Sequence, residues 1–309
     1  MYIYLQVEEL KLVDNMRVKL AALNGNTDEK DFADFLLQIG SGEIPTVPGE
    51  DDMIKIPEQM KSSSATLYQF FKEIYPNLKE RHQEGMKNIF TDNHHETWLM
   101  KRAIICATNE ECEKVNQIGV ESLPGSPMVY HSSDRVINAS EAFEYPTEFL
   151  WKINSGSMPP HTLVIKKGTP IMLLRNLDPA NGHVNGARYI VLNMTPKVIY
   201  ARLATPGVHQ GKELMIPRIL FHPKDRTIPF EMERKQFPVR ICFGQTSNKS
   251  QGQTYSIIGI NLSKDFFSHG QLYVALSRVG SQSHVKIFKP VSDPTPNQTR
   301  NVVFKTIFN

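Results

Sequence analysis

Apolar residues recur at helical spacing through most of the first ninety positions of the chain. They return every three or four positions in three stretches, which are residues 10–20, 32–39 and 64–90. Pro76 interrupts the third stretch, because proline has no amide hydrogen to donate inside a helix. The pattern therefore predicts two short helices followed by a broken one.

A strand and a capped helix are predicted next. The run 103–107 is apolar, which is typical of a buried strand. Thr108 and Glu111 have the spacing of a capping box, in which each side chain accepts a hydrogen bond from the backbone of the other residue. We expect a helix from there to about Leu123.

Residues 163–235 have a different pattern. Short β-favouring runs are separated by turn signals such as Asn181-Gly182 and Pro206-Gly207. The runs are 163–165, 171–174, 189–192 and 198–200. This pattern predicts a small β-barrel or sandwich.

Strands and helices alternate again after residue 237. Strands are predicted at 239–243, 257–262 and 285–288, and helices near Asn248 and from about 268 to 279. This alternation favours a parallel sheet covered by helices. The simplest fold is one α/β domain divided by a β-rich insert. The parts are an N-terminal segment (1–60), the first part of the α/β domain (61–160), the insert (161–236) and the remainder of the α/β domain (237–309).

Composition narrows the class of protein. A chain of 309 residues, 40% of them hydrophobic, can bury a core, and a net charge of +3 does not by itself indicate nucleic acid. The three cysteines, Cys106, Cys112 and Cys242, lack zinc-ligand spacing and favour buried thiols in a reducing compartment. No stretch approaches the roughly 18 apolar residues that span a bilayer, and the start lacks a signal sequence. We expect an intracellular protein with no membrane partner.

The candidate site is a polar segment, residues 245–254, directly after the strand predicted at 239–243. Ligands of open α/β sheets lie beyond the carboxyl ends of the strands, and backbone amides at a helix start suit a phosphate. Arg278 closes the helix predicted over 268–279. Two alternatives stay open: the segment is a solvated turn, or Arg278 only balances a helix dipole.

Two kinds of site are not indicated. Residues 211–213 read Gly-Lys-Glu and lack the earlier glycine of a phosphate loop. No predicted strand ends in an acidic pair suited to Mg²⁺. The adjacent side chains of residues 94–96, His-His-Glu, rarely converge on one ion. We predict no metal site in this chain.

Three motifs carry a family resemblance. Residues 246–254 and 273–278 resemble the fifth and sixth motifs of superfamily-one DNA helicases of the petite-integration-frequency type, and residues 12–18 are similar to the fourth. Residues 159–188 resemble the β-rich insert of the Helitron branch, as do residues 145–150 just before it. The resemblance covers nearly the whole chain.

The resemblance implies a fold and a function. Relatives are ATP-dependent DNA helicases that move five-prime to three-prime, with ATP and Mg²⁺ bound between two RecA-like domains of the P-loop NTPase type. This chain looks like the second RecA-like domain, split by an SH3-like insert. The implied partners are single-stranded DNA and a first RecA-like domain. The resemblance implies a location in the nucleus or another reducing intracellular compartment. It also implies roles in DNA repair, recombination and telomere maintenance.

The resemblance also assigns residues. Two arginines would contact the γ-phosphate, three residues would line the nucleotide cleft, and four would lie near single-stranded DNA. In that order, the residues are Arg17 and Arg278; Gln251, Gly252 and Gln253; and Thr246, Asn248, Lys249 and Ser250. An arginine placed at the transferring phosphate typically accelerates phosphoryl transfer roughly 10³- to 10⁵-fold.

The chain departs from the family pattern in two ways. Ser247 replaces an apolar residue of the fifth motif but leaves the flanking donors in place. The phosphate loop and the Mg²⁺ carboxylate are absent, so we expect this chain alone to bind ATP weakly and not to hydrolyse it. A truncated gene model, a decayed transposon copy and one half of a split product stay open as origins. A non-catalytic module for single-stranded nucleic acid and an inactive remnant stay open as alternative functions.

Overall fold

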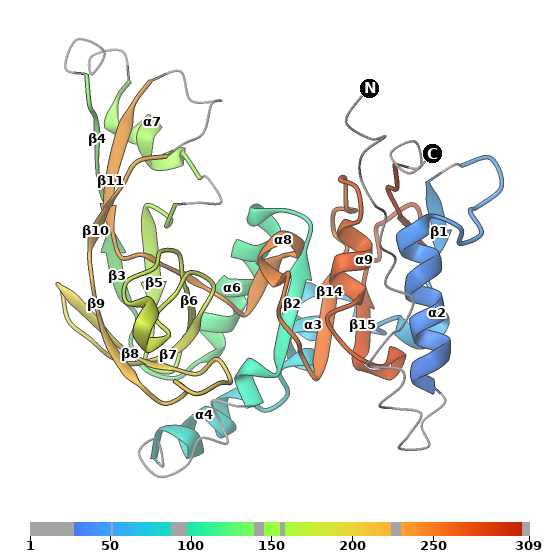
Figure 1. Cartoon of the computed structure of the whole chain (residues 1–309), viewed down its shortest axis with the longest axis horizontal. Coiled ribbons are helices and arrows are strands. Elements are labelled where there is room, and N and C mark those ends of the chain that lie inside the picture. The colour runs from blue at the N-terminus through green and yellow to red at the C-terminus, as the bar shows by residue number, and fades with distance from the viewer. Residues whose placement is uncertain are drawn as a thin grey trace, which may run out of the picture.

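A four-stranded parallel sheet forms the centre of the α/β part, with its strands in the order β13-β2-β14-β15. The computed structural model describes residues 28–50, 52–87, 98–138, 145–154, 158–223 and 230–304. The four strands are β2 (Arg102–Cys106), β13 (Gly244–Thr246), β14 (Ile257–Asn261) and β15 (Val285–Phe288). One of them precedes the β-rich region in the sequence and three follow it. The predicted α/β class, with a parallel sheet divided by an insert, is therefore confirmed (Figure 1).

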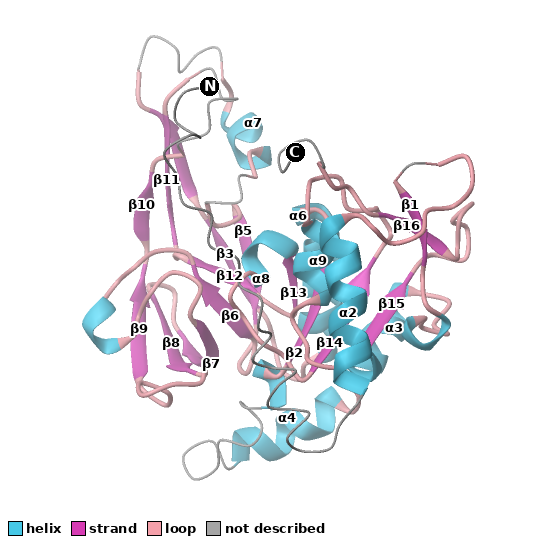
Figure 2. Cartoon of the chain, turned by 45° about the vertical axis from the view of Figure 1, so that its right-hand side comes forward, coloured by secondary structure: helices cyan, strands magenta, loops and turns pink. Residues whose placement is uncertain are grey.

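Helices cover both faces of this sheet because its strands are apolar on both sides. In β2, Ala103 and Ile105 pack into one hydrophobic cluster, and Ile104 and Cys106 pack into another. Helices α2 (Asp28–Ser41) and α9 (Gln271–Leu276) cover the first face, as Figure 2 shows. Helices α3 (Leu67–Ile74) and α6 (Asn109–Ser122) supply the second cluster.

The helix predictions are confirmed within the described residues, with one change at a cap. The stretch 64–90 forms α3 and α4 (Leu78–Lys87), on either side of Pro76. The stretch 10–20 lies outside the described residues. Thr108 accepts a hydrogen bond from the Glu111 amide at 3.3 Å, but the Glu111 carboxylate is directed to Asn261. The capping box predicted there is therefore only half formed.

The β-rich part consists of a five-stranded antiparallel sheet, β12-β6-β7-β8-β9, together with the sheets β10-β11-β4 and β3-β5. It lies beside the α/β part, with α6 and α8 between the two (Figure 1). Its elements are β3 (Met128–His131), β4 (Ser133–Val136), α7 (Thr147–Lys152), β5 (Thr162–Ile165), β6 (Pro170–Leu173), β7 (Arg188–Met194), β8 (Val198–Leu203), β9 (Glu213–Pro217), β10 (Ile219–Phe221), β11 (Met232–Gln236) and β12 (Val239–Ile241). Strands β3, β4 and β12 lie outside 161–236 but pair with strands inside it. The boundaries of the four sequence segments stay a prediction.

The strand predicted at 239–243 is present only at Val239–Ile241, and its expected place in the parallel sheet is wrong. Val239 pairs antiparallel with Leu173 in the β-rich part, whereas Gly244 pairs parallel with Ile104 in the main sheet. The chain crosses from one sheet to the other at Cys242, whose amide donates to the Pro170 carbonyl at 3.0 Å. The two ends of this run pack into different hydrophobic cores, Val239 into that of the β-rich part and Phe243 into that of the α/β part.

Shorter elements complete the fold. Strands β1 (Met53–Lys55) and β16 (Gln298–Arg300) pair antiparallel beside α2, and α8 (Ser247–Ser250) follows β13. Three 3-10 turns cover Glu58–Met60, Pro179–Asn181 and Gln282–His284. All three cysteines are free and buried, as predicted. None of the helices in the described ranges combines the length and hydropathy needed to cross a lipid bilayer.

One buried histidine joins α4 to the β-rich part. The Nε2 atom of His82 lies 2.9 Å from the Lys167 carbonyl oxygen, and its side chain packs against Gly168. A Cβ atom at Gly168 would lie 2.1 Å from the His82 ring, and the φ of +80° at this position also favours glycine. This contact therefore needs both residues.

We expect the protein to lose stability as the pH falls below about 6.5. Burial is the main cause that lowers the pKa of His82, His161 and His183 from the ordinary value of 6.5. Below that value the unfolded chain binds protons more readily than the folded chain, so the free energy of unfolding decreases; above it the contribution is fully present. Urea unfolding at several pH values measures the effect, and His82→Gln should flatten it. A midpoint that stays constant from about pH 7.5 to 5.5 would contradict this linkage.

Candidate functional site

The predicted site loop begins at the carboxyl end of β13, an edge strand of the parallel sheet. Ser247 is buried at the start of α8, and its hydroxyl donates to the Gln271 carbonyl of α9 at 2.8 Å. A polar residue is tolerated there because its hydroxyl is paired. Ser250, predicted to lie near DNA, is also buried and donates to the Ser247 carbonyl at 2.7 Å. Its side chain therefore faces the protein interior.

The residues predicted to line a nucleotide cleft follow α8 in a tight turn. Gln251 and Gly252 are exposed, and Gln253 is half-buried. The Gln253 amide donates to the Ser250 carbonyl at 3.0 Å, and this turn gives Gly252 a φ of +78°. Glycine adopts that conformation without strain, which explains its place in the turn.

Arg278 lies against this same turn. Its guanidinium donates to the carbonyls of Gln253 at 3.2 Å and Ser250 at 3.4 Å, and to the Val274 carbonyl at 2.7 Å. Arg278 is half-buried, just beyond α9. The structure thus brings Arg278 and Gln253 together, although they are 25 positions apart. Arg17, the other predicted arginine, lies outside the described residues.

A buried polar chain connects Gln253 to the β-rich part. The Tyr255 hydroxyl donates to the Gln253 side-chain oxygen and accepts from Gln245. The guanidinium of Arg188, on β7, lies 4.9 Å from the centre of the Tyr255 ring. Burial is the main cause that raises the pKa of Tyr255, so its hydroxyl keeps its proton and can donate. Sequence reasoning missed Tyr255 and Arg188, because no local pattern distinguishes them from core residues.

A cavity of about 610 Å³ opens on the other side of the loop. Its walls come from α6, from α7 and β5, and from the segment that carries β12, β13 and α8. Thr246 and Lys249 line it, whereas Asn248 is exposed but is not among its lining residues. The structure therefore brings together two of the four residues predicted to lie near DNA.

Positive charge gathers at one wall of this cavity. Burial lowers the pKa of Lys249, and the charges of Arg240 and Arg175 lower it further. Arg240 lines the cavity and donates to the Met158 carbonyl and to Asn154. Because these cations repel one another, an anion such as a phosphate would be stabilised beside them. Arg240 and Arg175 were not predicted, since each lies in an unremarkable strand or turn sequence.

No group of three or more His, Cys, Asp or Glu side chains that could hold a metal ion occurs in the ranges that the structure describes. Residues 94–96, which the sequence does not favour as metal ligands, lie outside those ranges.

Comparisons with known proteins agree with the motifs. A family profile described as "DNA helicase Pif1, 2B domain" matches residues 148–194, which contain β5, β6 and β7 and most of α7. The ATP-dependent DNA helicase PIF1 of Danio rerio is 28% identical over 195 residues, which are 59% of this chain and 26% of that protein. The chain matches a C-terminal Pif1-type helicase region.

Pif1 helicases are the petite-integration-frequency type that the motifs resemble. The ATP-dependent DNA helicase Pif1 of Bdellovibrio bacteriovorus is 34% identical over 119 residues, 38% of this chain and 26% of that protein. A crystal structure of Pif1 helicase from Candida albicans has a TM-score of 0.49 and 20% identity, covering 72% of this chain and 56% of that one. The chain spans about a quarter of the length of the curated relatives it matches.

Proposed function

We propose that this chain is the second motor domain and β-rich insert of an ATP-dependent, five-prime to three-prime DNA helicase. The observation that carries the proposal is that one loop contacts a cavity with its first half and Arg278 with its second half. Its first half places Thr246 and Lys249 at the cavity, and its second half is held by Arg278.

The nucleotide side of the loop fits one face of ATP. Arg278 supplies positive charge for a γ-phosphate, and Gly252 lets the backbone approach closely because it has no side chain. ATP and Mg²⁺ would supply the phosphoryl group and the countercharge. Among the described residues, hydrogen-bond donors and one glycine fit this ligand. The carboxylate for Mg²⁺ and the phosphate-binding loop would therefore come from the first RecA-like domain.

The cavity side of the loop fits the backbone of single-stranded DNA. Lys249, Arg240 and the Thr246 hydroxyl can donate to phosphate oxygens, which carry no sequence information. Binding should therefore be tolerant of sequence and sensitive to salt.

We expect Lys249→Ala to weaken binding to a short single strand and to flatten its salt dependence. Each lost phosphate contact lowers the slope of log K against log salt by about 0.7 for single strands. Fluorescence anisotropy with a labelled oligothymidine at several salt concentrations measures both quantities.

Lys55→Ala is the matched control for this experiment. Lys55 is exposed on β1, on the far side of the α/β part from the cavity. Its replacement should leave the slope unchanged. If the Lys249→Ala titration superimposes on that of the parent, Lys249 is a surface residue without a DNA contact.

A non-catalytic module for single-stranded DNA is the second candidate. It is favoured by one observation: Thr246, Lys249 and Arg240 all belong to this chain, so the cavity needs no first domain. DNA binding by the chain without any ATP hydrolysis in the presence of a first domain would support it. A nuclear or reducing setting, the Helitron relationship, and roles in repair, recombination and telomere maintenance stay predictions.

A further inference from the structure

An exposed tryptophan lies in the wall of the cavity. Trp151, on α7, is 42% exposed and lines the cavity together with its neighbour Lys152. Its indole ring is stacked on the imidazole of His161, with the ring centres 4.8 Å apart and the planes 16° from parallel. One face of the indole is thus covered by His161, and the exposed part of the residue is available to a second ring.

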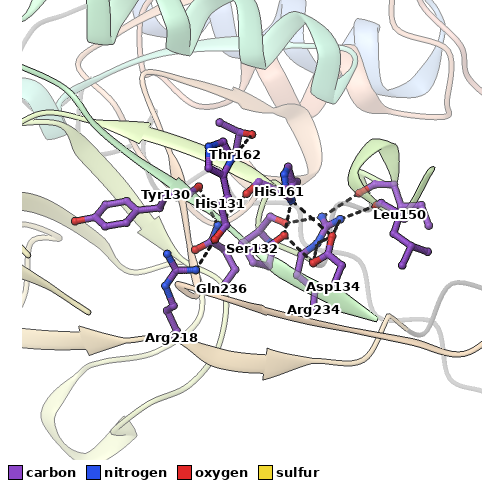
Figure 3. Close-up of polar contacts among 12 residues, drawn as sticks. Tyr130, His131, Ser132, Asp134, Leu150, His161, Thr162, Arg218, Arg234 and Gln236 are labelled. Atoms are coloured by element: carbon purple, nitrogen blue, oxygen red, sulfur yellow. Dashed lines mark hydrogen bonds and ion pairs between the residues drawn. The ribbon is translucent and has the colours of Figure 1, made fainter. Parts of the chain in front are cut away.

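His161 is itself fixed from behind. Its Nδ1 atom lies 2.8 Å from the Ser132 hydroxyl, and that hydroxyl donates to Asp134 at 2.6 Å. The His161 carbonyl accepts from the Ser132 amide at 2.8 Å and from Gln236 at 3.0 Å (Figure 3). The ring behind Trp151 therefore has a set position.

Arg234 holds both ring-bearing segments at once. Its buried guanidinium donates to the carbonyls of Leu150 and Ile153, on either side of Trp151, at 2.8 and 3.0 Å. It also donates to the Pro159 carbonyl at 3.1 Å, two positions before His161. Side chains that are fixed before a ligand arrives lose little conformational freedom on binding. The hydrogen bonds of Arg234 therefore pre-organise the aromatic surface formed by Trp151 and His161.

The charges in the same cavity identify a fitting ligand. Lys249 and Arg240 both come from the segment that carries β12 and α8, and Lys152 lines the cavity beside Trp151. Glu121, from α6, lines the cavity as well, and Glu113 lies near Arg240, since both residues bond Asn154. A chain of phosphates would therefore follow Lys249 and Arg240. A ligand with anionic groups along one edge and flat rings along the other matches this arrangement.

We infer that Trp151, backed by His161, is a stacking platform for one base of a single strand of DNA whose phosphates contact Lys249 and Arg240. This inference rests on the proposed DNA binding and adds a base contact to it. Stacking on an aromatic side chain is tolerant of base identity, because each base has a flat face. Trp151 is a binding residue in this account, and His161 and Arg234 are positioning residues.

We expect Trp151→Ala to weaken binding of oligothymidine about 5- to 150-fold, the range that corresponds to one stacked base. Trp151→Phe should retain part of the affinity. The salt slope should stay at the parent value in both variants, because no phosphate contact is lost, whereas Lys249→Ala changes that slope. On a strand without bases, which has the same phosphates, Trp151→Ala and the parent should bind alike.

Phe149→Ala is the matched control. Phe149 is on the same helix, is 48% exposed, packs beside Tyr145 and Phe230, and is not among the cavity lining. Its replacement should leave DNA affinity unchanged. A second measurement needs no change at the site: the chain has two tryptophans, so in a Trp98→Phe variant the fluorescence comes from Trp151. Oligothymidine should quench it, and the strand without bases should not.

The outcomes separate the two proposals. If oligothymidine binds the parent but Trp151→Ala binds equally well and Trp151 fluorescence is not quenched, the stacking platform is refuted and the proposed DNA binding stands. If no single strand binds the parent at all, the proposed function fails and the platform fails with it.

Discussion

Replacing Arg234 with alanine is expected to lower the free energy of unfolding by about 3–5 kcal/mol. The Arg234 and Asp134 side chains are both fully buried and are joined at 2.8 Å. Removal of the arginine leaves the carboxylate of Asp134 in the interior without its countercharge. It also removes the donors to the carbonyls of Leu150, Ile153 and Pro159. An unpaired buried charge costs far more than an ion pair at the surface contributes.

Arg135→Ala is the matched control, since it removes the neighbouring arginine of β4. The Arg135 side chain is 74% exposed and pairs with Glu233 on β11. Surface pairs typically contribute at most about 1 kcal/mol, so this variant should unfold close to the parent. Urea denaturation of parent and both variants makes the comparison. Equal decreases in the free energy of unfolding of the two variants would show that the buried Arg234 pair contributes no more stability than the exposed Arg135 pair.

Replacing Arg278 with alanine is expected to lower ATP hydrolysis roughly 10³- to 10⁵-fold in a helicase that combines this chain with a first motor domain. The transferring phosphoryl group spreads negative charge over its oxygens, and a fixed guanidinium stabilises that charge. Arg278→Lys should restore little of the ATP hydrolysis rate, because an ammonium group lacks the several coplanar N–H donors of a guanidinium. Steady-state phosphate release with single-stranded DNA measures the loss.

Arg278 also holds the site loop, so this variant needs a second readout. Its bonds to the Ser250 and Gln253 carbonyls are lost as well, and DNA affinity reports any loosening of the loop. Arg300→Ala is the control: that side chain is 56% exposed and lies beside Asp52. We expect this chain alone to hydrolyse no ATP. Turnover by the chain alone that Arg278→Ala leaves unchanged would overturn the site assignment.

Local patterns were sufficient for three of the four strands of the main sheet and for locating the motif loop. Strands β2, β14 and β15 are apolar runs between polar residues, and each lies within one position of its predicted bounds. The loop after β13 is recognisable because its polar residues and Gly252 are close together in the sequence. Such features depend on neighbours within a few positions, so a sequence displays them directly.

Local patterns failed where one run serves two structures. Residues 239–243 read as one strand of the main sheet, yet only 239–241 form a strand, β12, and it belongs to another sheet than β13, which follows at 244–246. An apolar side chain indicates that a residue is buried, but it does not indicate which of the two hydrophobic cores the residue packs into. The pairing of β3 and β4 with the later strands was missed for the same reason, because register between distant strands is set by tertiary packing.

The sequence by itself determined the class of fold, the buried cysteines and the residues of the motif loop. The tertiary structure alone decided which of those residues face the cavity, and it added Arg240, Trp151 and the buried pair of Arg234 and Asp134. Arg234 and Asp134 are 100 positions apart, and each alone resembles an ordinary surface charge. A charge becomes buried and paired only when both strands have packed, because its partner, its desolvation and its geometry are properties of the folded chain.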